Sequence, residues 1–346
     1  MPGVTYDKQV QFTRGGPVVL HVVTAPKPTG QYSLEPALSN GVIAGREPLT
    51  AIERRAGSPV VGLSGDFSYG DGRPYGIVIQ NGVLESAPLA TRSSLGIDAA
   101  GNLQVTRVTM TATWNGTGQR RPLLLNRPPG KNGVSLFTPA WGASTPTASD
   151  TIEAVVSGLP RTRPNVELAG TVATVRHGSG PIPADGAVLV ARGTGAQQLA
   201  AEAPAGTALG VRLPLKPDWW NVVDAIGGGP VIVKNGKAVL RAGEAFGTPV
   251  LAPRQARVAV GQRADGRILL VAADGGRLGY SVGLSNYDLG RALARLGAVT
   301  AYGLAPGAVV ALASDGTLVT RAAAGGERPL SDALLLRYRA AGSRRT

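Results

Sequence analysis

The sequence contains no cysteine and only two histidines in 346 residues. Without cysteine there is no disulfide, no thiolate nucleophile and no cysteine-based zinc site, and the redox state of the compartment stays undecided. The two histidines, His21 and His177, lie far apart, and neither belongs to an HxxxH or HxxE pair. We interpret each as a structural or surface histidine and predict no metal site, although the scattered aspartates leave binding of a hard cation open.

Long apolar runs are also missing. No stretch of about 18 apolar residues occurs, so the sequence predicts no transmembrane segment. The N-terminal stretch MPGVTYDKQVQFTRGG lacks the apolar core of a signal peptide. If the natural protein is exported, we expect its signal peptide to be absent from this chain and Met1 not to be its natural start.

Lysine is scarce, with six residues, although Lys and Arg together number 35 and the net charge is +13. An arginine excess favours anions such as phosphates, nucleic acid or acidic cell-wall polymers, because a guanidinium group bonds phosphate in a bidentate way. A coding bias towards arginine explains the excess equally well. We predict no nucleic-acid partner, since the arginines are scattered, phenylalanines number only four and no nucleic-acid-binding module is recognisable.

Apolar residues, glycine and proline are abundant. A hydrophobic fraction of 43% beside 16% charged residues predicts a globular chain. The 49 glycines and 26 prolines favour turns and short strands over long helices. Asn-Gly or Asp-Gly pairs between apolar runs indicate hairpins at 81–82, 235–236, 265–266 and 315–316. The sequence therefore predicts a mixed α+β fold that is β-rich, with largely antiparallel sheets and a few short helices.

Helical periodicity is clearest over residues 286–296, where four apolar side chains share one face, Ser285 can cap the start and Gly297 ends the helix. Shorter helices are expected at 49–55, 193–204 and 217–226, and a strand at 18–23. We interpret the chain as an extended lead-in (1–35), one continuous domain (36–338) with an embedded strand-rich elaboration (106–215), and a basic tail (339–346).

Seven blocks follow one another along the chain: LSGDFSYGDGRPYGIVIQNGVL, RSSLGID, NRPPGKNGVSLFTPAWGAST, AIGGGPVIVKNGK, ARVAVG, AADGGRLGYSVGLSNYDLGRALARLGA and ERPLSDALLL. Their order resembles that of the phosphodiester glycosidase family over about residues 35–338. That family includes the animal enzyme that uncovers mannose 6-phosphate by removing N-acetylglucosamine from a phosphodiester, and many exported bacterial proteins. The resemblance implies a sugar-phosphate or anionic-glycan partner and a secreted or cell-envelope location.

Several positions of the family pattern are retained. Gly65 and Asp66 fit its Asn-Gly-Asp-Phe block, with Ser64 in place of the asparagine, and Arg257 begins Arg-Val-Ala where the family has Arg-Thr-Ala. The Gly-Gly-Gly-Pro block is intact at residues 227–230. The resemblance assigns as catalytic candidates Asp66, Asp274 and Arg257, and as substrate-binding candidates Ser64, Gly65, Gly227, Gly228, Gly229, Arg277, Ser281 and Gly307.

Other positions depart from the pattern. In the Asp-Gly-Arg block, Gly276 stands where arginine is expected, and Arg277 follows one position later. The largest departure is at residues 303–310, which read GLAPGAVV where similar enzymes carry Asn-Leu-Asp-Gly-Gly-Gly-Ser-Ser. The carboxylate and both hydroxyls are lost, and Pro306 removes one N–H donor that such a turn could direct at a phosphate.

These losses bear on activity, because breaking a glycosidic bond needs a group that stabilises the oxocarbenium-like state and a proton donor, commonly two carboxylates. A phosphate leaving group needs less protonation but still needs fixed positive donors. Losing a positioned catalytic side chain costs orders of magnitude in rate. The sequence therefore predicts a site that binds or merely packs.

Each catalytic candidate has an ordinary structural alternative. Asp66 either accepts sugar hydroxyls or caps a turn. Arg257 either lines a wet pocket and meets an anion or is an exposed strand residue, and Asp274 either holds Arg257 or starts a turn. Trp219 and Trp220 either stack on a sugar or are partly buried in the core.

Two functions stay open. One is a catalytically inactive relative that binds an anionic glycan or serves as a structural module of the cell surface. The other is an active, divergent glycosidase that cleaves a sugar-1-phosphodiester in envelope or exopolysaccharide material. No organic cofactor is predicted, since the triple glycine before Pro230 leads into a hairpin and not into a helix. The sequence does not predict the oligomeric state.

Overall fold

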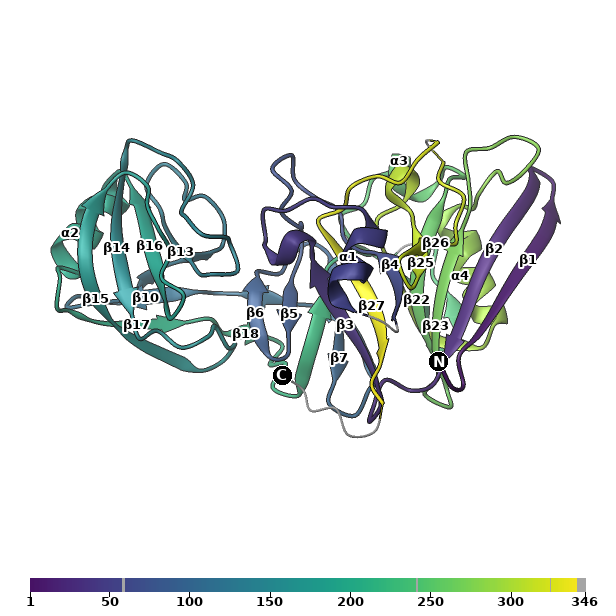
Figure 1. Cartoon of the computed structure of the whole chain (residues 1–346), viewed down its shortest axis with the longest axis horizontal. Coiled ribbons are helices and arrows are strands. Elements are labelled where there is room, and N and C mark those ends of the chain that lie inside the picture. The colour runs from purple at the N-terminus through teal and green to yellow at the C-terminus, as the bar shows by residue number, and fades with distance from the viewer. Residues whose placement is uncertain (58–59, 241, 324, 341–346) are drawn as a thin grey trace.

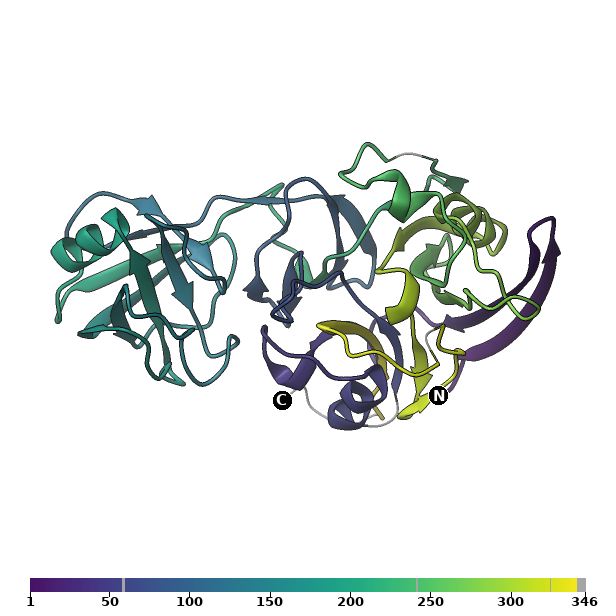
Figure 2. The same cartoon turned by 90° about the horizontal axis from the view of Figure 1, so that it is seen from above.

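The computed structural model describes residues 1–57, 60–240, 242–323 and 325–340. Strands make up 43% and helices 11% of it, and the sheets are mostly antiparallel, which confirms the predicted β-rich α+β fold. From residue 341 on, the predicted basic tail lies outside the described residues. An eight-stranded unit stands apart from the rest of the molecule in two views (Figures 1 and 2).

A seven-stranded antiparallel sheet lies at one end of the molecule, with strand order β1-β2-β23-β22-β24-β20-β21 (Figure 1). Helix α4 (Asn286–Arg295) packs on one of its faces through Leu289, Ala292 and Leu293. The predicted lead-in supplies the first two strands. The elements are β1 (Thr5–Thr13), β2 (Gly16–Ala25), β20 (Val231–Lys234), β21 (Lys237–Ala238), β22 (Arg257–Arg263), β23 (Ile268–Ala273), β24 (Ala298–Gly303) and α3 (Thr248–Leu251).

Two five-stranded sheets lie beside it, in the orders β26-β25-β4-β27-β3 and β6-β5-β19-β7-β8. Helix α1 (Leu49–Ala56), predicted at 49–55, packs on the first of them, and Gly57 is its C-cap. The elements are β3 (Tyr32–Leu38), η1 (Ser39–Gly41), β4 (Val60–Ser64), β5 (Val78–Gln80), β6 (Val83–Ser86), β7 (Ser93–Asp98), β8 (Leu103–Arg107), β19 (Val222–Ile226), η2 (Gly307–Val309), β25 (Leu312–Ser314), β26 (Thr317–Leu318) and β27 (Asp332–Tyr338).

The remaining large sheet, which we call the embedded sheet, has eight strands drawn from residues 113–212, inside the predicted elaboration. Two extended connections, which carry the small sheet β18-β9, join it to the main body (Figure 1). The elements are β9 (Thr109–Met110), β10 (Thr113–Asn115), β11 (Arg121–Pro122), β12 (Leu124–Leu125), β13 (Val134–Phe137), β14 (Thr151–Ser157), β15 (Glu167–His177), β16 (Gly186–Arg192), α2 (Thr194–Glu202), β17 (Ala208–Arg212) and β18 (Leu215–Lys216).

The central core of the main body forms where its three large sheets meet. One buried cluster combines Val258 and Leu270 of the seven-stranded sheet with Leu63 and Leu334 of the β4 sheet and Leu95 of the β7 sheet. Burying side chains of this size contributes about 1.5–3 kcal/mol each. The packing fixes the ends of β4, β7 and β27 near one another, and the candidate site is built there.

The local predictions fare differently. The Asn-Gly and Asp-Gly turns at 81–82, 235–236 and 315–316 have positive φ at both residues, as a type I′ hairpin requires. The helix predicted at 286–296 is confirmed, and Ser285 Oγ accepts the Asp288 N–H at 3.1 Å. The helix predicted at 217–226 is wrong, because its second half is strand β19, which pairs with β5 and β7. Tertiary pairing decides there against local propensity.

Candidate functional site

Asp66 lies just beyond the end of β4, between the neighbouring strands β25 and β27. Its carboxylate accepts two backbone hydrogen bonds, from Phe67 N–H to Oδ1 at 2.7 Å and from Gly76 N–H to Oδ2 at 2.6 Å. The residue is only 7% exposed. Asp66 therefore does cap a turn, as one of the sequence alternatives held, but its side chain also lines a small hollow.

Glycines surround the Asp66 carboxylate closely. A Cβ at Gly76 would lie 2.9 Å from Asp66 Oδ2, and one at Gly227 would be well inside contact distance of the same oxygen. A Cβ at Gly65 would overlap Asp332 Oδ1. These positions need glycine because backbone and carboxylate approach one another here without room for a side chain.

Asp332, at the start of β27, is the second carboxyl of this region and is fully buried. Its Oδ1 accepts the Asp66 N–H at 2.7 Å and the Ser331 hydroxyl at 3.3 Å, while its buried Oδ2 has no partner among the described residues. Burial raises the pKa of Asp66 to about 7. Burial, and then the negative charge of Asp66, raise the pKa of Asp332 to about 8. The pair thus retains protons at neutral pH.

Arg92 supplies the positive charge next to Asp66, and its field opposes the rise in the pKa of that carboxyl. Its guanidinium carbon lies 4.1 Å from the Phe246 ring centroid, 4.7 Å from that of Phe67 and 5.5 Å from that of Tyr75. Nε and Nη1 are buried and lack a hydrogen-bond partner among the described residues. Because an unpaired buried donor costs about 1–3 kcal/mol, these two N–H groups are suited to an anionic ligand.

A loop between β21 and α3 covers this region. Glu244 accepts the Ser93 N–H and the Val231 N–H, each at 2.8 Å, and Phe246 of the same loop packs on Arg92. Gly228 lines the hollow together with Asp66 and Arg92. The hollow has no room for a water-sized molecule in this conformation.

The segment 303–310 passes directly beside Asp66. Ala305 donates its N–H to Gly65 O at 3.0 Å, and Ser64 Oγ accepts the Ala311 N–H at 3.1 Å. Ala305 and Val310 are buried. This segment, which carries no charged side chain, is therefore bonded to the two residues that precede Asp66.

Asp274 belongs to a separate polar network at the end of β23. Its Oδ2 lies 3.0 Å from His21 Nε2 and accepts the Tyr280 hydroxyl at 2.8 Å, and His21 Nδ1 lies 2.8 Å from the Tyr6 hydroxyl. Ser281 donates its hydroxyl to the Asp274 carbonyl at 2.5 Å. Burial and the Asp274 carboxylate raise the pKa of Tyr280 to about 12. His21 is thus a structural histidine. Asp274 contacts this histidine and not, as one of the sequence alternatives had it, Arg257.

Arg257 lies in β22 next to Ala273 of β23, but it points to the opposite side of the sheet from Asp274. It shares its face with Ala259, which packs with helix α4, whereas Asp274 contacts His21 on the other face. Burial lowers the pKa of Arg257 to about 10, and the negative charge of Asp288 opposes this shift.

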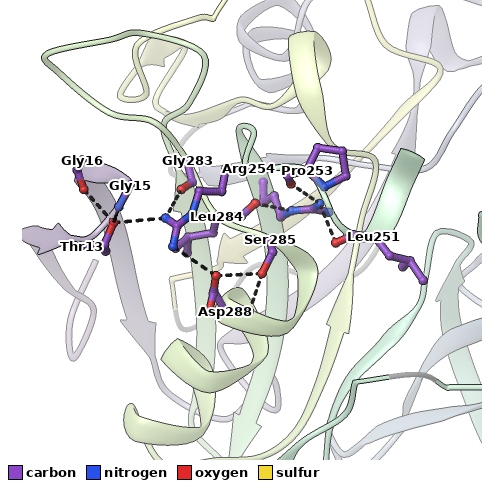
Figure 3. Close-up of polar contacts among 11 residues, drawn as sticks. Thr13, Gly15, Gly16, Leu251, Pro253, Arg254, Gly283, Leu284, Ser285 and Asp288 are labelled. Atoms are coloured by element: carbon purple, nitrogen blue, oxygen red, sulfur yellow. Dashed lines mark hydrogen bonds and ion pairs between the residues drawn. The ribbon is translucent and has the colours of Figure 1, made fainter. Parts of the chain in front are cut away.

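Backbone carbonyls satisfy the Arg257 guanidinium. It donates to Leu284 O at 2.6 Å, Val250 O at 2.7 Å and Pro253 O at 3.0 Å, in the region drawn in Figure 3. The same figure shows Arg254 of the neighbouring loop reaching Asp288 of α4. Arg257 is neither exposed nor free for an anion, contrary to both sequence alternatives, because it ties the 250–253 turn to the start of α4.

The predicted site residues therefore divide into separate groups. Ser64, Gly65, Asp66 and the triple glycine lie together around the hollow. Arg277 donates to Ala322 O, on the side of the Asp274 network. The remaining candidate, Gly307, donates its N–H to Ala256 O at 2.9 Å and has φ 86°, a backbone role.

Sequence reasoning missed Arg92, Asp332 and Glu244. Arg92 begins the block RSSLGID and directly precedes β7, and Asp332 lies inside the block ERPLSDALLL as the first residue of β27, so each charge stands at the start of a buried strand. Such a charge is costly to bury without a partner, which is the signal that could have identified them. Trp219 is buried and Trp220 is 82% exposed, so only the second is free to contact a ligand.

The described residues contain neither a metal-binding cluster nor a membrane-spanning helix. No group of three or more histidine, aspartate or glutamate side chains within them could hold a metal ion. No helix in the same residues is long and apolar enough to cross a membrane.

The fold and the site define a β-rich α+β protein that has a buried carboxyl beside a guanidinium, two nitrogens of which lack hydrogen bonds to the residues that the structure describes. Residues 162–337, slightly more than half of the chain, match the phosphodiester glycosidase family, and the chain belongs to that family. None of the curated proteins matches the sequence.

Solved structures share the fold. A "hypothetical protein" from Synechocystis is similar at 28% identity and TM-score 0.77 over 97% of this chain, which spans 62% of the Synechocystis chain. A "putative exported protein" from Burkholderia pseudomallei K96243 is 22% identical at TM-score 0.75, with 93% of this chain and 74% of that chain covered. The zebrafish N-acetylglucosamine-1-phosphodiester alpha-N-acetylglucosaminidase catalytic domain, auto-inhibited by its pro-peptide, is 14% identical at TM-score 0.56. The match covers 98% of this chain and 85% of the zebrafish chain.

Proposed function

We propose that this protein binds a sugar phosphate or another anionic glycan in the pocket of Asp66 and Arg92, with weak or lost glycosidase activity. The observation that carries the proposal is the Arg92 guanidinium, which has two buried nitrogens without hydrogen-bond partners in the described part of the chain and lies beside a buried carboxyl. A phosphate oxygen would pair with those nitrogens, and the Asp66 carboxyl would bond sugar hydroxyls.

Weak hydrolysis follows from the groups around the pocket. Asp274 and Arg257 are engaged elsewhere, and residues 303–310, which are bonded to Gly65 beside Asp66, carry no carboxylate or hydroxyl group. The second carboxyl, Asp332, is fully buried and bonded to the Asp66 backbone, which leaves it no access to a substrate. A two-carboxylate mechanism lacks its second accessible member in this arrangement.

One observation favours the alternative, an active divergent enzyme that cleaves a sugar-1-phosphodiester. The pKa of Asp66, about 7, lies near the operating pH at which a general acid works best. With Arg92 compensating the charge of the phosphate leaving group, Asp66 alone could assist bond cleavage. Both the proposed binding and this mechanism require Glu244 and Phe246 to move, since the hollow has no room for a ligand.

We further propose that the protein acts outside the cytoplasm, on bacterial cell-envelope or exopolysaccharide material. The likeness to a protein described as exported supports this location. The excess of arginine supports a partner rich in phosphate or carboxylate groups.

Calorimetric titration with the methyl diester of N-acetylglucosamine 1-phosphate tests the proposed binding. Arg92→Met should weaken binding about 10- to 100-fold, the effect of losing a charge-assisted hydrogen bond of about 1.5–3 kcal/mol. Arg120→Met is the matched control, because Arg120 is an exposed arginine that pairs with Glu167 on the embedded sheet. Absence of binding, or equal binding by the Arg92 and Arg120 variants, would contradict the proposal.

A further inference from the structure

A second cavity of about 600 Å³ lies where the main body meets the embedded sheet. Its walls come from β6 of the main body and from loops of the embedded unit, and they include Glu85, Thr138, Arg161, Thr162 and Asp185. The volume falls within the roughly 300–1,000 Å³ of small-molecule sites, which often form at domain junctions. None of these residues lines the Asp66 hollow.

Hydrogen bonds hold the two walls together. Leu84 N–H donates to Thr162 O at 2.6 Å, and the Thr162 hydroxyl donates back to Leu84 O at 2.7 Å. Asn126 Nδ2 donates to both Glu85 O at 2.8 Å and Thr138 Oγ1 at 2.9 Å. The cavity is therefore preformed, which lowers the entropic cost of binding.

Glu85 is the group in this cavity that lacks a partner. Its Oε2 is buried without a hydrogen-bond donor among the described residues. Burial raises the pKa of Glu85 to about 7, and the positive charge of Arg161 opposes this rise. The charged side chains lining the cavity are thus two carboxylates, Glu85 and Asp185, and one guanidinium, Arg161, although the chain carries a net charge of +13.

We propose that this cavity binds a sugar that carries a free amine, with its ammonium group on Glu85. A buried carboxylate without a donor is best satisfied by a cation that also donates hydrogen bonds. Asp185 and Arg161 provide an acceptor and a donor for hydroxyls in the same space. A sugar fits these spread polar groups of both signs better than a single lysine side chain does, and the choice of a sugar rests on the proposed function.

Calorimetry at pH 7, where part of the Glu85 side chains is ionised and part of the ligand amines is protonated, tests the assignment with a β-1,4-linked glucosamine trimer. Glu85→Gln should weaken binding at least tenfold, and the N-acetylated trimer should bind the wild type at least tenfold more weakly than the free amine. Glu167→Gln, which removes an exposed carboxylate on the embedded sheet, is the matched control and should leave the affinity unchanged. Melting temperatures verify that the variants fold.

The pH dependence of binding gives a second readout. The proposed contact needs an ionised Glu85 and a protonated amine, and both groups titrate near neutral pH, so the trimer should bind most tightly near pH 7 and more weakly at pH 5, where Glu85 is protonated. The loss of affinity between pH 7 and pH 5 should be absent in Glu85→Gln.

Several results would overturn the assignment: no binding, equal binding of the acetylated trimer, equal binding of lysine amide, or no loss in Glu85→Gln. Arg92→Met separates the two sites, because it should weaken the sugar phosphodiester and leave the glucosamine trimer unaffected. If Arg92→Met weakened the binding of both ligands, both would bind at one site, and the proposed site in the Glu85 cavity would be refuted.

Discussion

The buried carboxyl of Asp332 should make stability depend on pH in a direction opposite to that of ordinary salt-bridged aspartates. Its pKa is about 8 in the folded protein, against an ordinary value of 3.8. The folded state therefore keeps a proton that the unfolded chain releases above pH 4. As pH rises from 4 to 8, the free energy of unfolding falls.

Asp332→Asn removes this titration and keeps an oxygen that can accept the Asp66 N–H. Between pH 5 and pH 7, the free energy of unfolding of the variant should rise relative to wild type by up to about 3 kcal/mol, because one proton contributes roughly 1.4 kcal/mol per pH unit. This value is an upper bound, because water that enters the site stabilises the ionised form. Buried Glu53, whose pKa is about 7, changes both proteins alike and cancels in the difference.

Guanidinium chloride unfolding at pH 5, 6, 7 and 8 measures the difference. Asp71→Asn is the matched control, because Asp71 is a half-exposed aspartate paired with Arg73. Its difference from wild type should stay constant within about 0.5 kcal/mol over this range. The reasoning is refuted if the difference between Asp332→Asn and wild type is equally independent of pH.

Two further substitutions test the account. Gly227→Ala places a Cβ against Asp66 Oδ2, and it should cost about 1–3 kcal/mol of stability and weaken sugar-phosphodiester binding. Gly70→Ala, in open space, should change neither property. Equal effects of the two substitutions would contradict the close packing of glycine around Asp66. Arg257→Met leaves carbonyls of Leu284 and the 250–253 turn without their donor and should cost about 1–3 kcal/mol in chemical denaturation. It should leave sugar-phosphodiester affinity unchanged, and a selective loss of affinity would return Arg257 to the site.

Local rules predict the parts of this fold that depend on a few neighbouring residues. Asn81 and Asn235 with their following glycines specify hairpins, and Ser285 caps α4, because turn and cap geometry is decided within four residues. The strand at 222–226 was predicted as a helix, since its pairing with β5 and β7 depends on residues far away in the sequence. Composition suffices for the β-rich class, because glycine and proline limit helix length.

The site was predictable only in part. Asp66 and its glycines could be found from the family resemblance. Arg92 follows Asp66 by 26 residues in the chain, and Asp332 belongs to β27 near the C-terminus. The packing of three sheets brings both residues next to Asp66. Strand periodicity places Arg257 and Asp274 on neighbouring strands but does not say that they point to opposite faces.

The most direct test of the proposed loss of activity is release of free N-acetylglucosamine from a synthetic N-acetylglucosamine-1-phosphodiester by the purified protein. We predict a rate no higher than that of Asp66→Asn, while the ligand still binds and Arg92→Met weakens that binding. Turnover above the level of both variants would contradict this account and establish Asp66 and Arg92 as the working site of an active glycosidase.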